Sequence, residues 1–218
     1  MSRAVNKKEK RQMVEWSLYE KILKQIVADV KTNPSLQQAY ECMVKKAGKY
    51  GKIREDWSLI PWQQLPEKNR KRRQAYDEFI AALNILADAY EKDRKPAWRI
   101  ELGDEGALLG NFAVYVGKVN TAYPMRMQVL YAVLWASENA EEVAQLISYA
   151  DSVKDAKKYF VLKGFTENQA QCILDVRIKS CCKEQKEKVY REMEVMDKLC
   201  IVEPQSILPS MNENKITI

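Results

Sequence analysis

An all-α, or nearly all-α, fold is predicted by three features of this sequence. Leu, Ala, Glu, Lys and Gln, which form helices readily, recur throughout the chain. Apolar residues in most segments lie three and four positions apart, which is the spacing of one face of an α-helix. Only seven Gly and seven Pro occur in 218 residues. We therefore expect a compact multi-helix bundle with short loops, and a chain of this length can bury a substantial core.

The first two helices are indicated by regular apolar spacing. A helix is expected over residues 12–31, and its apolar residues are Leu18, Ile22, Leu23, Ile26, Val27 and Val30. Asn33-Pro34-Ser35 should end it, because proline fits the first turn of a following helix. Gly48 is expected to end the second helix. The inward residues of that helix are Leu36, Ala39, Tyr40, Met43, Val44 and Ala47.

Residues 48–66 break the helical pattern and form the longest irregular stretch before the C-terminal tail. They contain Trp57 and Trp62, which indicates that the stretch packs against the rest of the protein. A third helix is expected over residues 67–93. It begins with a run of basic residues and continues with apolar residues at helical spacing, namely Tyr76, Phe79, Ile80, Leu83, Leu86, Ala87 and Tyr90.

Residues 97–120 carry a mixed signal. Residues 98–102 alternate in polarity like a short strand, and residues 112–119 fit either a strand or a helix. A short hairpin near 98–119 is therefore one expectation. The other, which we favour, is a helix over about 105–117.

The C-terminal helices are marked by residues that start or end helices. The four expected starts are Thr121 with Pro124, Asn139 with Glu142, Asp151 with Ser152, and Thr166 with Gln169. The second and fourth of these have the capping-box pattern, and Gly164 should close the helix that Ser152 opens. A charged helix over 183–199 is expected to be the last one. The chain then divides into a flexible basic lead-in (1–11), a basic N-terminal helical region (12–120), a helical module (121–199) and a tail (200–218).

The most distinctive run is Gln169-Ala170-Gln171-Cys172-Ile173-Leu174-Asp175-Val176-Arg177-Ile178, which follows the Thr166 cap. It resembles the segment near the exit gate of type IIA DNA topoisomerase A subunits, those of DNA gyrase and topoisomerase IV. That family typically has a Ser or Thr cap followed by Gln-Ala-x-Ala-Ile-Leu-x-Met-Arg-Leu. The resemblance continues upstream through the apolar residues 129–136 and the run 138–147, and downstream through Lys186-Glu187-Lys188-Val189. It covers roughly residues 124–199.

The chain also departs from that family. It reads Cys181-Cys182-Lys183-Glu184-Gln185 where the family has Leu-Thr-Gly-Leu-Glu, so Glu184 replaces a core leucine. Residues 1–123 show nothing like the family's winged-helix domain, and no Arg-Tyr pair marks a DNA-cleaving tyrosine. The resemblance therefore implies a helical module, which in the family forms a dimer contact at the exit gate. It does not imply a DNA-joining activity.

Composition argues against a catalytic role. The chain has no His, which is the commonest general base. Its five Cys contain no Cys-x-x-Cys pair, so the usual zinc spacings are absent. It has neither a phosphate-cradling glycine loop nor a nucleophile motif of the Gly-x-Ser-x-Gly type. We expect no enzymatic activity, no cofactor and no metal.

The sequence also bears on the compartment. No apolar run reaches about 18 residues, and the N-terminus is polar and basic without an apolar stretch. We therefore expect no membrane span and no secretory signal. A cytoplasmic protein with reduced cysteines is the predicted setting.

Positive charge is concentrated in the N-terminal half. Residues 1–98 hold 21 Lys and Arg against 13 Asp and Glu, whereas residues 99–218 hold 15 against 17. Contacts with DNA or RNA phosphates are predicted for the cluster at the start of the third helix, for the two nearby tryptophans as stacking surfaces, and for the N-terminal lead-in. The predicted residues are Lys68, Arg70, Lys71, Arg72, Arg73, Trp57, Trp62, Lys7, Lys8, Lys10 and Arg11. The alternative is a solvated basic face with two core tryptophans.

Polar residues of the distinctive run are predicted to contact protein partners or a second copy of the chain. They are Gln169, Gln171, Asp175 and Arg177. The alternative is that they satisfy backbone groups or one another at a helix junction. Three functions follow, in order of preference: a non-catalytic helical subunit or accessory factor of a nucleic-acid-associated complex, a protein-interaction or regulatory module without nucleic-acid binding, and a piece of a split topoisomerase.

Overall fold

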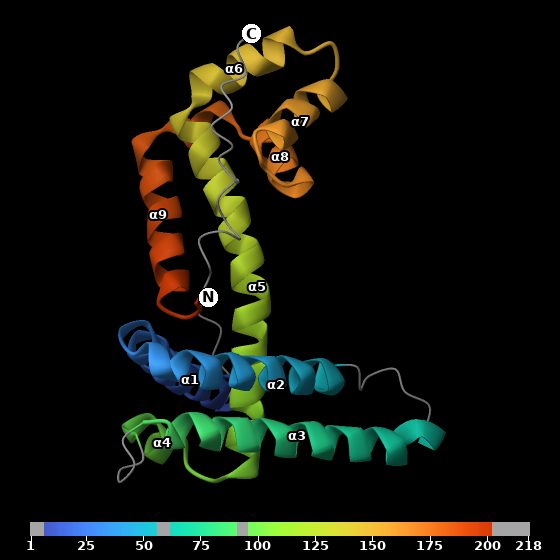
Figure 1. Cartoon of the computed structure of the whole chain (residues 1–218), viewed down its shortest axis with the longest axis vertical. Helices are drawn as coiled ribbons and strands as arrows, with labels where there is room; N and C mark the ends of the chain where they lie inside the picture. The colour runs from blue at the N-terminus through green and yellow to red at the C-terminus, as the bar shows by residue number, and fades with distance from the viewer. Residues whose placement is uncertain (1–6, 56–61, 91–95, 202–218) are drawn as a thin grey trace. The chain divides into compact units, whose positions relative to one another are not determined.

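The computed structural model describes residues 7–55, 62–90 and 96–201, and for residues 7–14 and Trp62 it describes the backbone only. Within these ranges all regular structure is helical, which confirms the all-α prediction (Figure 1). The described chain forms two compact units. Unit 1 comprises the described residues up to Thr121 together with Lys198–Ile201, and unit 2 comprises Ala122–Asp197.

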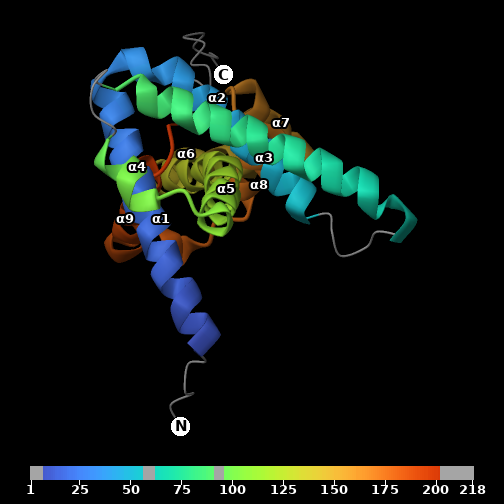
Figure 2. The same ribbon diagram turned by 90° about the horizontal axis from the view of Figure 1, so that it is seen from below.

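Unit 1 is built from α1 (Lys7–Thr32), α2 (Gln37–Glu55), α3 (Leu65–Asp88), α4 (Ala97–Leu102) and the first part of α5 (Gly106–Glu138). The apolar stripe of α1 is buried as its spacing predicts, from Tyr19 through Val30. Asn33 caps the short 3-10 helix Pro34–Leu36 with its side chain, which turns the chain from α1 into α2. The helices α2 and α3 run side by side in opposite directions (Figures 1 and 2).

Glycines in α2 and α5 let these two helices pack closely. A Cβ atom on Gly117 would lie 3.1 Å from the carbonyl oxygen of Ala47 and 3.1 Å from the Cα of Gly48. At Gly51 a Cβ would lie 3.9 Å from the Cα of Val114. Gly48 therefore does not end α2 as predicted, and the helix continues to Glu55. The tertiary contact with α5 overrides the weak helix propensity of glycine.

The predicted hairpin near 98–119 is wrong, because these residues form α4 and the first half of α5. In α4, Trp98 and Leu102 are buried on one helix face, whereas Ile100 and Glu101 are exposed. The burial of these residues follows the helix and not the alternation of a strand. Gly103 ends α4 with a φ of 63°, a backbone conformation that favours glycine. The favoured alternative, a helix over about 105–117, is confirmed and extended by α5.

Pro124 lies inside α5 rather than at the start of a new helix. A proline in this position leaves the carbonyl of Asn120 without its usual helical donor. Buried apolar residues on both sides of it, including Val119 and Met127, nevertheless keep the helix continuous. Packing of this apolar face therefore outweighs the local tendency of proline to break a helix.

Unit 2 contains the rest of α5 and four further helices: α6 (Ala140–Tyr149), α7 (Val153–Leu162), α8 (Glu167–Leu174) and α9 (Lys183–Asp197). One core cluster joins α5 to α9 through Met127, Leu130 and Met196. A second cluster is formed by Ala132, Ala136, Phe160, Phe165, Ala170 and Ile173. Trp135 packs on this second cluster, with its ring 4.8 Å from that of Phe165.

The predicted helix caps of unit 2 were partly right. Ser152 accepts a hydrogen bond from the Asp155 amide, and Thr166 and Gln169 form the predicted capping box. The predicted box at Asn139 is wrong, because its side-chain amide donates to the Trp135 carbonyl of the preceding helix, 2.8 Å away. None of the five cysteines, all of which lie in the described ranges, forms a disulfide.

Candidate nucleic-acid interface

The first turns of α3 are exposed on every side. No residue between Leu65 and Ala75 is buried, and Arg70, Lys71, Arg72 and Arg73 are all exposed. In Figures 1 and 2 this end of α3 reaches beyond the end of α2. The cationic cluster predicted from the sequence is thus a solvent-facing helical segment of unit 1.

The fold brings a second set of cations to this segment, and sequence reasoning missed it. The rings of Tyr50 and Tyr76 lie 5.7 Å apart, and both Lys46 and Lys49 reach Glu78. Because α2 and α3 are antiparallel, the residues after Tyr50 on α2 lie beside those before Tyr76 on α3. Lys52 and Arg54 therefore lie at the level of the cationic cluster.

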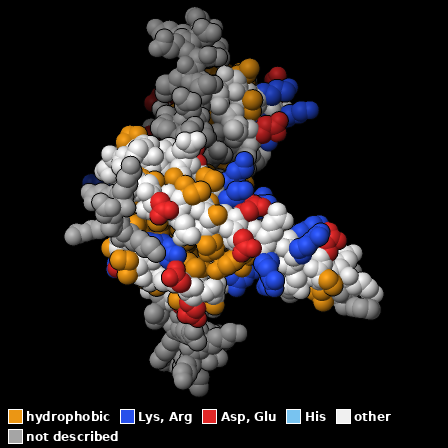
Figure 3. Space-filling view, turned by 60° about the horizontal axis from the view of Figure 1, so that its bottom comes forward, with side chains coloured by type: hydrophobic (Ala, Val, Ile, Leu, Met, Phe, Trp, Pro, Cys, Tyr) orange, Lys and Arg blue, Asp and Glu red, His pale blue; other side chains and the backbone are white. Residues whose placement is uncertain are grey.

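We call the cations of residues 45–54 and 68–73 the basic surface. Residues 45–55 and 65–78 together hold ten Lys and Arg against four Asp and Glu. This surplus of six equals the formal net charge of the whole chain, +6. Figure 3 shows Lys and Arg side chains gathered along the arm at its lower right, with fewer acidic side chains between them. The sequence signal for the α2 part is that Lys or Arg recurs at intervals of one to three residues along one helix.

Two acidic residues partly neutralise the basic surface. Lys71 pairs with Glu67 at 2.7 Å, and both side chains are mostly exposed, so the pair contributes little to stability. Lys46 and Lys49 each lie 2.9 Å from Glu78. Their hydrogen bonds lower the pKa of the Glu78 carboxyl to about 2. Glu78 therefore stays ionised at all ordinary pH values and holds both lysines.

The basic surface is not explained by helix stability. Cations near the start of a helix oppose its macrodipole, which is positive at the N-terminus. Neighbouring Arg70, Lys71, Arg72 and Arg73 also repel one another, and none of them contributes to the core. Helix stability therefore does not account for the cations of this segment.

The other predicted phosphate contacts lie outside the described side chains. Lys7, Lys8, Lys10 and Arg11 form the first turns of α1, where only the backbone is described. Trp62 begins the short 3-10 helix Trp62–Gln64, again with its backbone alone described. Trp57 falls outside the described residues. The part that these six residues play stays a prediction.

The predicted interface residues of unit 2 differ in their exposure to solvent. Gln169 is only 3% exposed. Its Oε1 accepts from the Thr166 amide at 3.0 Å, and its Nε2 donates to the Gln128 carbonyl at 3.2 Å. Gln169 thus satisfies backbone groups inside unit 2, whereas Gln171, Asp175 and Arg177 are exposed. A contact with a partner through these three residues stays a prediction.

Replacing Gln169 with leucine should lower the free energy of unfolding by about 1–3 kcal/mol, because the buried polar groups around it lose their hydrogen bonds. The matched control is Gln171→Leu, since the exposed Gln171 bonds only to Asp175, 3.2 Å away. We expect that control to change the free energy by no more than about 0.5 kcal/mol. Urea unfolding followed by circular dichroism measures both. Equal losses for the two variants would contradict the internal role of Gln169.

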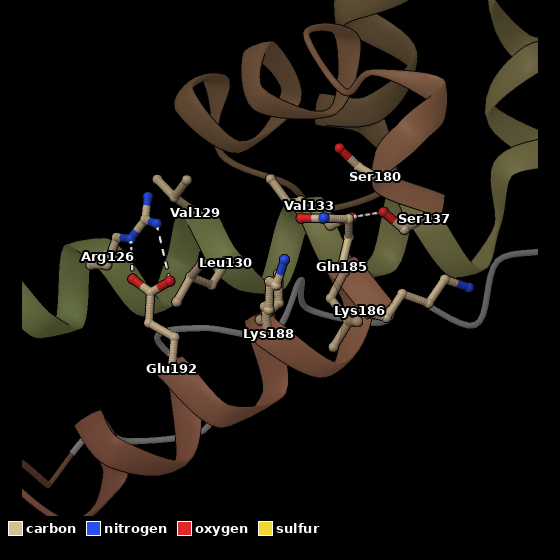
Figure 4. Close-up of a pocket in the computed structure, with 12 residues that line it drawn as sticks. Arg126, Val129, Leu130, Val133, Ser137, Ser180, Gln185, Lys186, Lys188 and Glu192 are labelled. Atoms are coloured by element: carbon tan, nitrogen blue, oxygen red, sulfur yellow. Dashed lines mark hydrogen bonds and ion pairs between the residues drawn. The ribbon is translucent and has the colours of Figure 1, made fainter. Parts of the chain in front are cut away.

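Unit 2 also contains a cavity of about 230 Å³ between α5 and α9 (Figure 4). Several of its polar lining residues are bonded within unit 2. Arg126 and Glu192 point toward each other at 2.8 Å, and the Ser137 hydroxyl donates to the Val133 carbonyl at 2.7 Å. Lys188 pairs with Glu184 at 2.6 Å.

The described residues lack two further features, a cluster of metal ligands and a membrane-spanning helix. They contain no group of three or more His, Cys, Asp and Glu placed to hold a metal ion. None of their helices combines the length and apolar character that crossing a membrane requires.

Comparison of the chain with protein-family models, with curated proteins and with solved structures gave no match. The resemblance of residues 124–199 to the topoisomerase A subunit therefore stays a prediction.

Proposed function

We propose that this chain is a non-catalytic helical protein that binds nucleic acid through the basic surface of unit 1, as a subunit or accessory factor of a larger complex. The observation that supports this proposal is the pairing of α2 with α3. It places ten Lys and Arg against four Asp and Glu on two adjacent helical segments. Four of these ten cations are consecutive and exposed, at residues 70–73 of α3.

Phosphates are the partner that such a surface fits best. Each Lys or Arg that neutralises a phosphate releases a condensed counterion, so affinity falls steeply as the salt concentration rises. Arginine can bind a phosphate with two parallel hydrogen bonds, and Arg70, Arg72 and Arg73 supply three such groups. The resemblance of unit 2 to a DNA-associated family is consistent with this role, but the proposal does not rest on that resemblance.

The test is binding of labelled DNA and RNA of about 20 nucleotides, measured by fluorescence anisotropy across a salt series. The triple variant Arg70→Ala, Arg72→Ala and Arg73→Ala should reduce the slope of log K against log salt by about 0.9 for each of the three residues that contacts a duplex phosphate. The matched control is Lys154→Ala, Lys179→Ala and Lys183→Ala, which removes three exposed cations of unit 2. Absence of binding at low salt, or an equal effect of both triples, would overturn the proposal.

Replacing Glu78 with glutamine should strengthen binding, because it removes the carboxylate that holds Lys46 and Lys49. We expect an affinity gain of roughly twofold to tenfold at low salt, with a steeper salt slope, because two further cations become available to phosphates. The control is Asp88→Asn at the opposite end of α3, which removes the same charge and should leave affinity nearly unchanged.

The same carboxylate gives a prediction for pH. The folded pKa of Glu78, about 2, lies below its ordinary value of 4.5. Its attraction to the two lysines is therefore complete above pH 4.5 and is lost as the pH falls toward 2. A side-chain carboxyl signal of Glu78 that titrates near 4.5 in an NMR experiment would contradict this pairing.

A second function, a protein-interaction module, is favoured by one observation in unit 2. Helix α6 buries none of its residues completely, and several apolar side chains of α6 and α7 are exposed. The most exposed are Tyr149 at 75%, Val153 at 72% and Leu162 at 70%. Light scattering tests self-association, and loss of a dimer on Arg177→Glu would locate the contact on the distinctive run. A monomeric mass at all concentrations would argue against a homodimer.

A further inference from the structure

The outward face of the exposed α3 segment carries a particular set of side chains. Successive residues of an α-helix lie about 100° apart around its axis. Ala75, Phe79 and Leu83 are buried and so define the side of α3 that faces the core. Arg70 and Arg73 lie on the opposite side, Asn69 and Lys71 lie on the two flanks, and all four are exposed. Gln74 shares that side but bonds to Glu78 at 3.2 Å.

These side chains are the types that read base pairs in DNA. Arginine donates two hydrogen bonds to the O6 and N7 atoms of guanine. Lys71 lies on one flank of the segment, where a phosphate would be in reach. A helix with guanidinium groups at its front and a cation on its flank fits a groove bounded by two phosphate backbones.

The dimensions of the segment agree with insertion into such a groove. An α-helix with its side chains is about 10–12 Å wide, and the major groove of B-form DNA is about 12 Å wide. Residues 65–74 would span roughly 15 Å at the usual helical rise. This end of α3 reaches beyond α2, so α2 would not obstruct its approach (Figures 1 and 2). Asp77 follows on the outward face, which limits the DNA-facing segment to the residues before it.

We propose that the start of α3 inserts into the major groove of double-stranded DNA, where Arg70 and Arg73 contact base edges while Lys71 contacts a phosphate. This proposal rests on the proposed function and specifies its ligand. A double-stranded RNA would be bound poorly, because its major groove is deep and narrow. Single-stranded DNA has no groove to hold the flanks.

The first experiment compares three ligands of equal length at one salt concentration: duplex DNA, duplex RNA and single-stranded DNA. Duplex DNA should bind at least about tenfold more tightly than the other two. A fourth ligand is duplex DNA with 7-deazapurines, which lack the N7 acceptor but keep the backbone. Its affinity should fall about tenfold or more, since one bidentate base contact is of that magnitude, while the salt slope stays unchanged.

The second experiment separates the two kinds of side chain by selection from random-sequence duplexes. Arg70→Ala should relax the base preference at one position, whereas Lys71→Ala should reduce the salt slope by about 1 and leave the preference intact. Similar affinity for all four ligands would overturn the groove assignment and leave the proposed function standing. No binding of any ligand would overturn both.

Discussion

Replacing Gly117 with leucine is expected to lower the free energy of unfolding by about 2–3 kcal/mol. The Cβ atom would already lie 3.1 Å from main-chain atoms of α2, and these atoms belong to a helix that cannot move locally. The rest of the side chain would have to push α5 away from α2, and overpacking of this kind typically costs about 1–3 kcal/mol. Urea or thermal unfolding followed by circular dichroism measures the loss.

The matched control for Gly117 is Gly48→Ala, in the same helix crossing. A Cβ on Gly48 meets no atom within 4 Å. Alanine in a helix interior is favoured over glycine by about 0.5–1 kcal/mol, so this variant should be slightly more stable than the wild type. A wild-type unfolding midpoint for Gly117→Leu would mean that α2 and α5 do not pack as closely as described.

The double variant Arg70→Glu and Arg73→Glu is expected to weaken duplex DNA binding at least about a hundredfold at low salt. The change removes two phosphate or base contacts and places two negative charges in the strongest field of the nucleic acid. Both residues are exposed and none of their atoms enters the core. The free energy of unfolding should therefore change by no more than about 0.5 kcal/mol.

The control with the same change in net charge is Lys154→Glu with Lys183→Glu, two exposed lysines of unit 2. It should lower affinity only slightly, through the overall charge of the protein. Anisotropy titrations give the affinities, and urea unfolding shows that each variant is folded. If both pairs weaken binding equally, net charge rather than the basic surface governs the interaction.

Local sequence signals were reliable where the interactions are local. The apolar spacing of residues 18–30 identified the buried face of α1, because that pattern depends only on helix periodicity. The capping box of Thr166 and Gln169 was also recognised, since all of its hydrogen bonds join residues three positions apart. The basic run at the start of α3 was also recognised from the sequence, because it consists of neighbouring residues.

The same signals failed where distant contacts decide the outcome. Gly48 and Pro124 are residues that commonly end or start helices, yet both lie inside long helices. Gly48 lies in a close crossing of α2 with α5, and Pro124 is flanked by buried apolar residues. Asn139 failed as a cap for a local reason, because its amide donates to the Trp135 carbonyl four residues before it. For Gly48 the deciding neighbour lies on a helix far away in the sequence, which the local pattern does not contain.

The sequence by itself determined that this protein is all-α and that its positive charge lies in the N-terminal half. Both follow from residue type and spacing along the chain. Only the tertiary structure decided which charges act together and which polar residues are buried. It placed Lys52 and Arg54 at the level of the α3 cluster along the paired helices and enclosed Gln169 within unit 2. The physical reason is that charge density and burial depend on the pairing of helices, and that pairing is set by close packing between residues far apart in sequence.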